Sequence, residues 1–100
     1  MTSIIAAVLV TVTAYCPCRT CCGKWAGGPT ASGRMPVAGV TVAASRSIPF
    51  GTRVYIPGAG WRTVQDRLAR RYDDRIDLYM TSHAAALRWG KRKLNVEVTR

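Results

Sequence analysis

The chain has 100 residues, a length that suits a single domain, which we expect to span residues 1–100. Apolar residues make up 48% of the chain and charged residues 20%, a balance that excludes a disordered, highly charged tail. With 15 Lys and Arg against 5 Asp and Glu, the net charge of +10 points to an anionic partner: nucleic acid, a membrane surface or an anionic cell-wall polymer. No run approaches the roughly 20 apolar residues that cross a bilayer, so we expect no membrane span.

The first element of the chain is an apolar run, Ile4 to Val12, about as long as the core of a signal peptide. The residues before it contain no Lys or Arg, which such a signal needs. The run continues to Tyr15 with β-branched and aromatic residues, which are typical of a strand. We therefore favour a first strand over a signal remnant, and the chain then carries no export address of its own.

Short strands separated by turns follow. They are expected at Gly39–Ala44, Arg53–Ile56, Trp61–Gln65, Ile76–Met80 and Lys93–Val98. Ser82 offers an N-cap and Gly90 a C-terminal stop for one short helix over His83–Trp89, in which Trp89 is expected to pack in the core. Many short strands in a small chain favour a sheet that closes on itself, so we predict a mainly β fold, a small six-stranded barrel with one short helix.

The loop between the first two strands, residues 16–36, holds a cluster of four thiols: Cys16, Cys18, Cys21 and Cys22. Adjacent or nearly adjacent cysteines make poor disulfides, although cross pairs within the cluster are compatible with the geometry. Alternatively, four thiolates, or three with His83, could complete a tetrahedral structural zinc site. Zinc, disulfides and free thiols all stay open, because the redox compartment decides among them.

The acidic residues gather in one segment, because four of the five are Asp66, Asp73, Asp74 and Asp77. We expect Asp73 and Asp74 to pair with neighbouring arginines. Asp66 and Asp77 fall in predicted strands, where Asp is depleted, so each is expected either to accept backbone N–H groups or to face a cleft. A partly desolvated carboxyl has a raised pKa and can serve as a general acid.

Two further residues are candidates for contacts with a ligand. His83 is the only histidine; at the start of a helix it is a neighbour of the cap, a substrate contact or a metal ligand. Trp25, in the cysteine-rich loop, is a candidate platform for a sugar ring.

Several segments of the chain together resemble the bacterial and phage 3D domain, which is named for three aspartates. They are Thr13–Cys18, Cys21–Lys24, Thr30–Gly33, Ile48–Gly58, Val64–Arg67, Arg75–Tyr79, Ser82–His83 and Ala86–Gly90. The match runs in order over about residues 12–98. It implies a double-psi β-barrel, like the catalytic domain of MltA-type lytic transglycosylases and the Sps resuscitation-associated proteins.

The resemblance also implies an activity: cleavage of the MurNAc–GlcNAc bond of peptidoglycan glycan strands to give 1,6-anhydro products. It makes Asp77 the catalytic acid and Asp66 its supporting carboxylate, and catalysis then needs no cofactor. We assign substrate contacts to Trp25, Thr30, Ser32 and His83. A monomeric module of the phage endolysin type, acting at the bacterial cell wall, fits this interpretation.

The chain departs from the family pattern at two places. Ala44 stands where the family has its first aspartate, and Leu68–Asp73 replaces a glycine-rich loop. Other interpretations are a non-catalytic wall-binding module and a lysozyme-like hydrolase that uses two carboxyls. Nucleic-acid binding is suggested by charge alone, and no aromatic–basic motif supports it.

Overall fold

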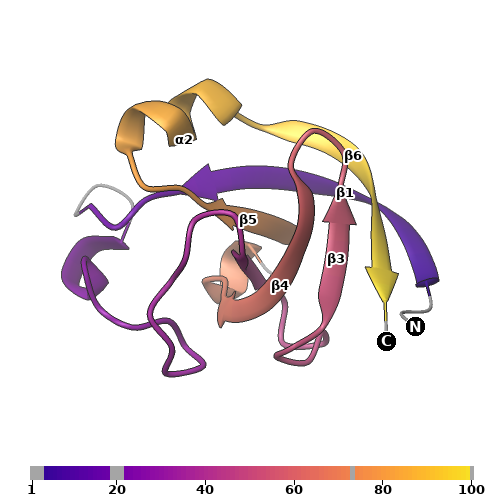
Figure 1. The fold of residues 1–100 in the computed structure, drawn as a ribbon, viewed down its shortest axis with the longest axis horizontal. Helices are drawn as coiled ribbons and strands as arrows, with labels where there is room; N and C mark the ends of the chain where they lie inside the picture. Colours follow the sequence, from indigo (N-terminus) through magenta and orange to yellow (C-terminus); the bar gives the residue numbers. More distant parts are fainter. Residues whose placement is uncertain (1–3, 19–21, 73, 100) are drawn as a thin grey trace.

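The computed structural model describes residues 4–18, 22–72 and 74–99, which form a closed, mainly β barrel of six strands (Figure 1). Around the barrel the order is β1-β5-β2-β4-β3-β6, and β6 returns to β1. The strands are β1 (Ile4–Tyr15), β2 (Thr41–Ala44), β3 (Arg53–Ile56), β4 (Gly60–Arg67), β5 (Arg75–Tyr79) and β6 (Arg92–Thr99). The prediction of a small six-stranded barrel is confirmed, while the double-psi arrangement stays a prediction.

The described α-helix, α2 (His83–Trp89), has the predicted bounds. Its first turn is capped by Ser82, whose Oγ accepts the Ala85 N–H at 3.1 Å. Gly90 ends the helix with a φ of 71°, a left-handed conformation that glycine adopts without strain. Two 3-10 turns, η1 (Gly23–Trp25) and η2 (Arg70–Tyr72), interrupt the loops. Within the described ranges, no helix is long and apolar enough to span a membrane.

The core follows from the alternation of side chains along the strands. In β5, Ile76 and Leu78 are buried, whereas Arg75, Asp77 and Tyr79 are half-buried. The buried cluster comprises Val12, Val42, Ala44, Val54, Ile56, Val64, Ile76, Leu78, Trp89 and Val96. The core prediction for Trp89 is confirmed, and its indole N–H donates to the Val12 carbonyl at 3.1 Å, which anchors α2 on β1.

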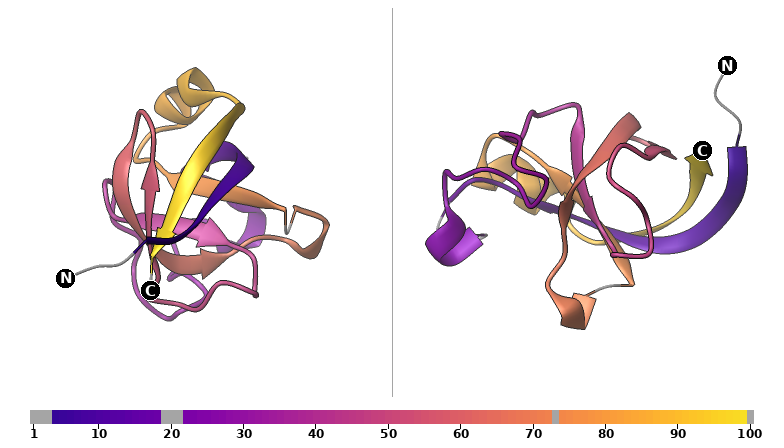
Figure 2. Two further views of the ribbon diagram at one scale, coloured as in Figure 1. Left: turned by 90° about the vertical axis from the view of Figure 1, so that its right-hand side faces the viewer. Right: turned by 90° about the horizontal axis from the view of Figure 1, so that it is seen from below.

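The long strand β1 connects the two ends of the molecule. It pairs antiparallel with β6, and its start lies beside the end of the chain (Figure 2), with Ile4 opposite Thr99. Its last residues pair in parallel with β5, which places Thr13 opposite Asp77 and Tyr15 opposite Tyr79. The C-terminal end of β1 therefore lies next to the segment that carries one of the candidate carboxylates.

A bulge in β4 determines which side chains of β4, β2 and β5 lie on the same face of the sheet. Val42 of β2 pairs with Val64, but the next residue, Ala43, pairs with Asp66, so Gln65 is the extra residue. Ala43 also pairs with Asp77 on its other side. Asp66 and Asp77 consequently flank one small residue of the strand between them.

Candidate functional site

The two strand aspartates lie on the face of the sheet that points away from the core. The core side chains of β5 and β2 are the neighbours of Asp77 and Ala43 along each strand, and they point to the opposite face. Ala43 lies between the two aspartates, and its side chain is a single methyl group, so no larger side chain separates the two carboxylates. The sequence prediction that the two aspartates lie in strands is confirmed.

Asp66 is held by three hydrogen-bond donors. Its Oδ1 accepts the backbone N–H groups of Ala31 at 2.9 Å and Arg67 at 2.8 Å, and its Oδ2 accepts the hydroxyl of Tyr15 at 2.9 Å. Donors on both oxygens fix the orientation of the carboxylate. Burial, reinforced by Asp66, raises the pKa of Tyr15, so this phenol stays protonated as a donor.

Asp77 has a different environment. Its Oδ1 accepts one described side-chain hydrogen bond, from the hydroxyl of Thr13 at 3.0 Å. Burial raises the pKa of Asp77 to about 6; the Thr13 hydrogen bond and Arg75 oppose the rise, and Asp66 adds to it. The sequence analysis expected a partly desolvated carboxyl here, and burial contributes more to this pKa than the charge of Asp66 does.

Ala44, which the resemblance aligns with the first aspartate of the family pattern, belongs to the core. Its side chain is fully buried in the apolar cluster, and the residue next to it, Ala43, faces the two carboxylates. Position 44 is thus on the opposite side of the strand from Asp66 and Asp77, and its alanine removes no group that lies between them.

The segment with the predicted substrate contacts Thr30 and Ser32 forms a tight turn against β4. The hydroxyl of Thr30 donates to the carbonyl of Arg34 at 2.8 Å and lies 2.9 Å from the hydroxyl of Ser32. The backbone N–H of Ser32 donates to the carbonyl of Gln65 at 3.2 Å. These bonds present the Ala31 N–H to Asp66, so the turn builds one side of the carboxylate site; direct contacts with substrate stay a prediction.

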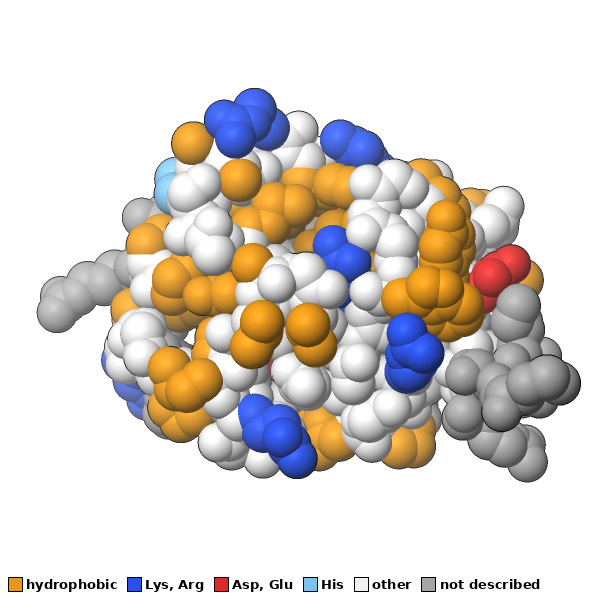
Figure 3. All heavy atoms as spheres, in the orientation of Figure 1, with side chains coloured by type: hydrophobic (Ala, Val, Ile, Leu, Met, Phe, Trp, Pro, Cys, Tyr) orange, Lys and Arg blue, Asp and Glu red, His pale blue; other side chains and the backbone are white. Residues whose placement is uncertain are grey.

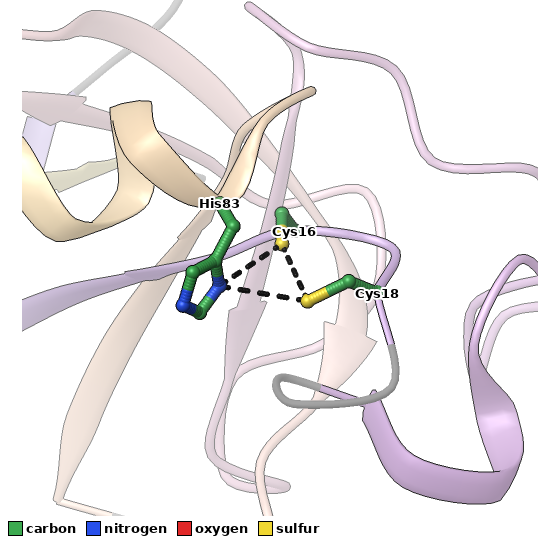
Figure 4. Close-up of side chains that lie close together, drawn as sticks. All are labelled: Cys16, Cys18 and His83. Atoms are coloured by element: carbon green, nitrogen blue, oxygen red, sulfur yellow. Dashed lines mark hydrogen bonds between the residues drawn. The ribbon is translucent and has the colours of Figure 1, made fainter.

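Three of the chemistry-bearing residues of the loop and helix converge beyond the end of β1 (Figure 4). Cys16 Sγ lies 3.0 Å from Cys18 Sγ and 3.6 Å from His83 Nδ1, and Cys18 Sγ lies 3.5 Å from the same nitrogen. Their ligand atoms all fall within 4.8 Å of one another, close enough to bind one metal ion. Cys16 is buried, whereas Cys18 and His83 are half-buried.

The other cysteine with a described position, Cys22, turns toward the carboxylate site. Its thiol donates to the carbonyl of Cys16 at 3.1 Å, and its pKa is raised first by burial and then by Asp66 and the thiols of Cys16 and Cys18. None of the three described cysteines lies at disulfide-bonding distance from another. Cys21 and the side chain of Trp25 fall outside the described residues.

The carboxylate site and the cluster of Cys16, Cys18 and His83 adjoin through the last residues of β1. Thr13 contacts Asp77, Tyr15 contacts Asp66, and Cys16 belongs to the cluster. The ring of Tyr15 also packs edge-on against Tyr79, with centroids 5.4 Å apart. The sequence analysis gave no role to Thr13, Tyr15 or Ala31, because their contacts depend on strand pairing and loop closure that no local pattern reveals.

A hollow elsewhere on the barrel is distinct from this site. Its lining is mostly apolar, and neither Asp66 nor Asp77 belongs to it. The lining residues are Val8, Val10, Ser45, Ser47, Ile48, Asp74, Arg75, Ile76, Val96 and Val98. This hollow opens among core side chains and offers no pair of carboxyls, so we place no chemistry there.

Comparison with known proteins gives two findings. The chain is 28% identical over 90 residues to a Bacillus subtilis (strain 168) protein described as "Putative cell wall shaping protein YabE". That alignment covers 89% of this chain but 22% of the relative, so the chain spans about a fifth of the relative's length. Residues 40–100, which include β2 to β6 with Asp66, Asp77 and His83, match the 3D domain, and the chain therefore belongs to the 3D domain family.

Proposed function

We propose that the protein cleaves peptidoglycan glycan strands as a lytic transglycosylase, with Asp77 as its general acid and base. The observation that carries the proposal is the half-buried carboxyl of Asp77, whose pKa of about 6 leaves about a tenth of it protonated at pH 7 and about half at pH 6. Asp66, held by three donors, lies across Ala43 and helps to stabilise positive charge on the sugar.

The chemistry needs one group that first gives and then takes a proton. The protonated carboxyl of Asp77 gives its proton to the glycosidic oxygen between MurNAc and GlcNAc while the C1–O bond breaks and positive charge develops at C1 of MurNAc. The GlcNAc side leaves as an alcohol. The Asp77 carboxylate then removes the proton of the MurNAc C6 hydroxyl, and O6 bonds to C1, which yields the 1,6-anhydro ring and restores the acid.

The cell wall as substrate is supported by charge and by the relative. The description of the relative names the shaping of the cell wall, and this supports the cell wall as the substrate. Lys and Arg side chains are spread over the face in Figure 3, where acidic side chains are few, in keeping with the net charge of +10. Such a surface attracts anionic wall polymers. We therefore place the action of the protein at the bacterial cell wall.

The proposed reaction takes no cofactor, since one carboxyl moves the proton and an internal hydroxyl replaces water. For the cluster of Cys16, Cys18 and His83 we propose zinc with a structural role. Contacts between the glycan and Trp25, Thr30, Ser32 or His83 remain predictions; if His83 binds metal through Nδ1, only its other ring nitrogen is left for substrate.

The test is mass spectrometry of the products released from purified peptidoglycan. A transglycosylase yields muropeptides that end in 1,6-anhydro-MurNAc, whereas a lysozyme-like hydrolase yields reducing ends heavier by one water. Reducing ends would assign the two carboxyls to a hydrolase. Intact glycan strands after digestion would overturn the enzymatic proposal.

A second candidate, a wall-binding module, has one observation in its favour. Tyr55 and Trp61 lie exposed on the β3–β4 hairpin, with 37% and 39% of their surfaces accessible and their rings packed edge-on at 5.4 Å. The guanidinium of Arg53 stacks on Trp61 at 4.9 Å from the ring centroid. Exposed aromatic rings beside a cation suit sugars and anionic polymers. Sedimentation with insoluble wall, without release of muropeptides, would favour this function.

A further inference from the structure

We propose that His83 is a metal ligand, and that it forms with Cys16 and Cys18 a structural zinc centre that fixes the cysteine-rich loop to the start of α2. The proposal is independent of glycan cleavage, because it concerns metal binding and stability. The proposed ligand set excludes Cys22. It uses Nδ1 of His83, so this nitrogen is not available to bind the substrate.

The described distances suit a tetrahedral ion. Zinc bonds of about 2.3 Å to sulfur and 2.0–2.1 Å to nitrogen place a sulfur and a nitrogen ligand about 3.6 Å apart, and two sulfurs about 3.8 Å apart. The two distances from sulfur to His83 Nδ1, 3.6 and 3.5 Å, match this geometry. The thiols of Cys16 and Cys18, at 3.0 Å, need to separate by only about 0.8 Å to hold the ion.

The fold holds these ligands together from distant parts of the sequence. Cys16 follows β1 directly, and His83 is the first residue of α2 (Figure 4). The Met80 N–H donates to the carbonyl of Tyr15 at 2.7 Å, which joins the ends of β1 and β5 just before each ligand. Capping by Ser82 fixes the first turn of the helix and hence the position of the imidazole.

The described geometry leaves Cys22 out of the ligand set. Its thiol donates to the carbonyl of Cys16, and its sulfur does not belong to the group of ligand atoms that lie within 4.8 Å of one another. Cys22 is therefore the natural control for the three proposed ligands.

A structural metal would also stabilise a loop that has few buried residues of its own. Of the described residues in 17–36, Thr30 alone is buried, so these residues contribute little apolar surface to the core. A metal closure can supply the stability that apolar packing does not. The same loop gives the Ala31 N–H to Asp66, so the metal supports the carboxylate site from outside it.

The experiment measures the metal directly in the full chain, purified under reducing conditions and without chelator. We expect about one zinc per chain by elemental analysis, and a melting temperature that falls on chelation and recovers when zinc is returned. Cobalt substitution should give the intense visible absorption of a tetrahedral thiolate site. A chain that holds no zinc, gives no such cobalt spectrum and has all thiols open to alkylation in the native state would overturn the proposal.

Paired variants test each ligand. Cys16→Ser, Cys18→Ser and His83→Phe should each lower zinc content at least about tenfold, whereas the matched control Cys22→Ser should keep it. His83→Cys should restore binding, because a thiolate replaces the imidazole. If a serine or phenylalanine variant fails to fold, cobalt titration of the wild type and of His83→Cys still tests the site. The added thiolate of His83→Cys should increase the absorption from sulfur-to-cobalt charge transfer. Full zinc in His83→Phe, or its loss in Cys22→Ser, would contradict the ligand set.

Discussion

Asp66 and Asp77 lie on the same face of the same three strands, yet their surroundings differ. Asp66 accepts hydrogen bonds from three donors, two of them backbone N–H groups, and these fix its orientation. Asp77 accepts a single described hydrogen bond, from Thr13, and its pKa is raised by burial. The comparison teaches that residue type and strand position do not assign roles to a carboxylate pair; the number of donors and the depth of burial do.

The largest effect should come from replacing Asp77, the proposed general acid and base. Asp77→Asn keeps the shape of the side chain and can still accept the Thr13 hydrogen bond, but the amide cannot deliver and recover a proton. Glycan cleavage should fall about 10²–10⁴-fold. The measurement is turbidity clearance of purified walls, with circular dichroism to confirm folding. The matched control is Asp74→Asn, an exposed loop carboxylate, which should keep wild-type activity. An active Asp77→Asn protein would refute the mechanism.

A smaller loss is expected at the other carboxylate. Asp66→Asn retains an oxygen for the two backbone donors, while the Tyr15 hydroxyl can turn to accept from the new amide. The loss of one charge-assisted bond and of negative charge near the sugar should reduce cleavage about tenfold. The same clearance assay measures it. A loss at Asp66→Asn larger than at Asp77→Asn would show that the two roles are exchanged.

Stability should respond to the two aspartates with opposite signs. Asp66→Ala leaves three donors without their acceptor and should lower the free energy of unfolding by about 1–3 kcal/mol. Asp77→Asn should raise it at pH 7 by about 1–3 kcal/mol, because the folded wild type there carries a buried charge. Chemical denaturation at pH 7 measures both, and a stabilising Asp66→Ala would contradict the comparison.

The stability gained by Asp77→Asn should depend on pH, because the burial cost applies only to the ionised carboxylate. The pKa of Asp77 is about 6 in the folded chain and lies lower when unfolded, so wild type loses stability as pH rises through this window. The advantage of Asp77→Asn should therefore shrink as pH falls and vanish at about pH 3 and below, where the carboxyl is protonated in both states. An advantage that persists at this pH would have another cause.

The smallest effect is a displacement of the pH profile. The hydrogen bond from Thr13 lowers the pKa of Asp77, so Thr13→Val should raise this pKa. The alkaline limb of the activity profile should then move to higher pH, since the acid stays protonated longer. Thr11→Val, two residues earlier on the same face of β1, is the matched control. A shift to lower pH in Thr13→Val would contradict the assigned contact.

Local sequence patterns were enough to predict the strands and the helix, but they could not predict which strands pair with each other. The caps Ser82 and Gly90 predicted α2 at its observed bounds, and the alternation of Arg53–Ile56 predicted β3 in the same way. The parallel pairing of β1 with β5 leaves no local signal, because its hydrogen bonds join segments about 64 residues apart. Thr13 and Tyr15 could therefore not be linked to Asp77 and Asp66 from the sequence.

The bulge at Gln65 has a consequence for how this chain can vary. In a regular strand, an odd number of inserted or deleted residues exchanges the two faces of everything beyond the change, because side chains alternate. A bulge is the exception, since it takes up one extra residue and the pairing beyond it keeps its register. Without Gln65, Asp66 would follow Val64 directly and would still pair with Ala43, on the same side as Asp77. Loss of this one residue should therefore spare the pair of carboxylates, whereas loss of a residue from the regular part of β4 should exchange the faces of that strand.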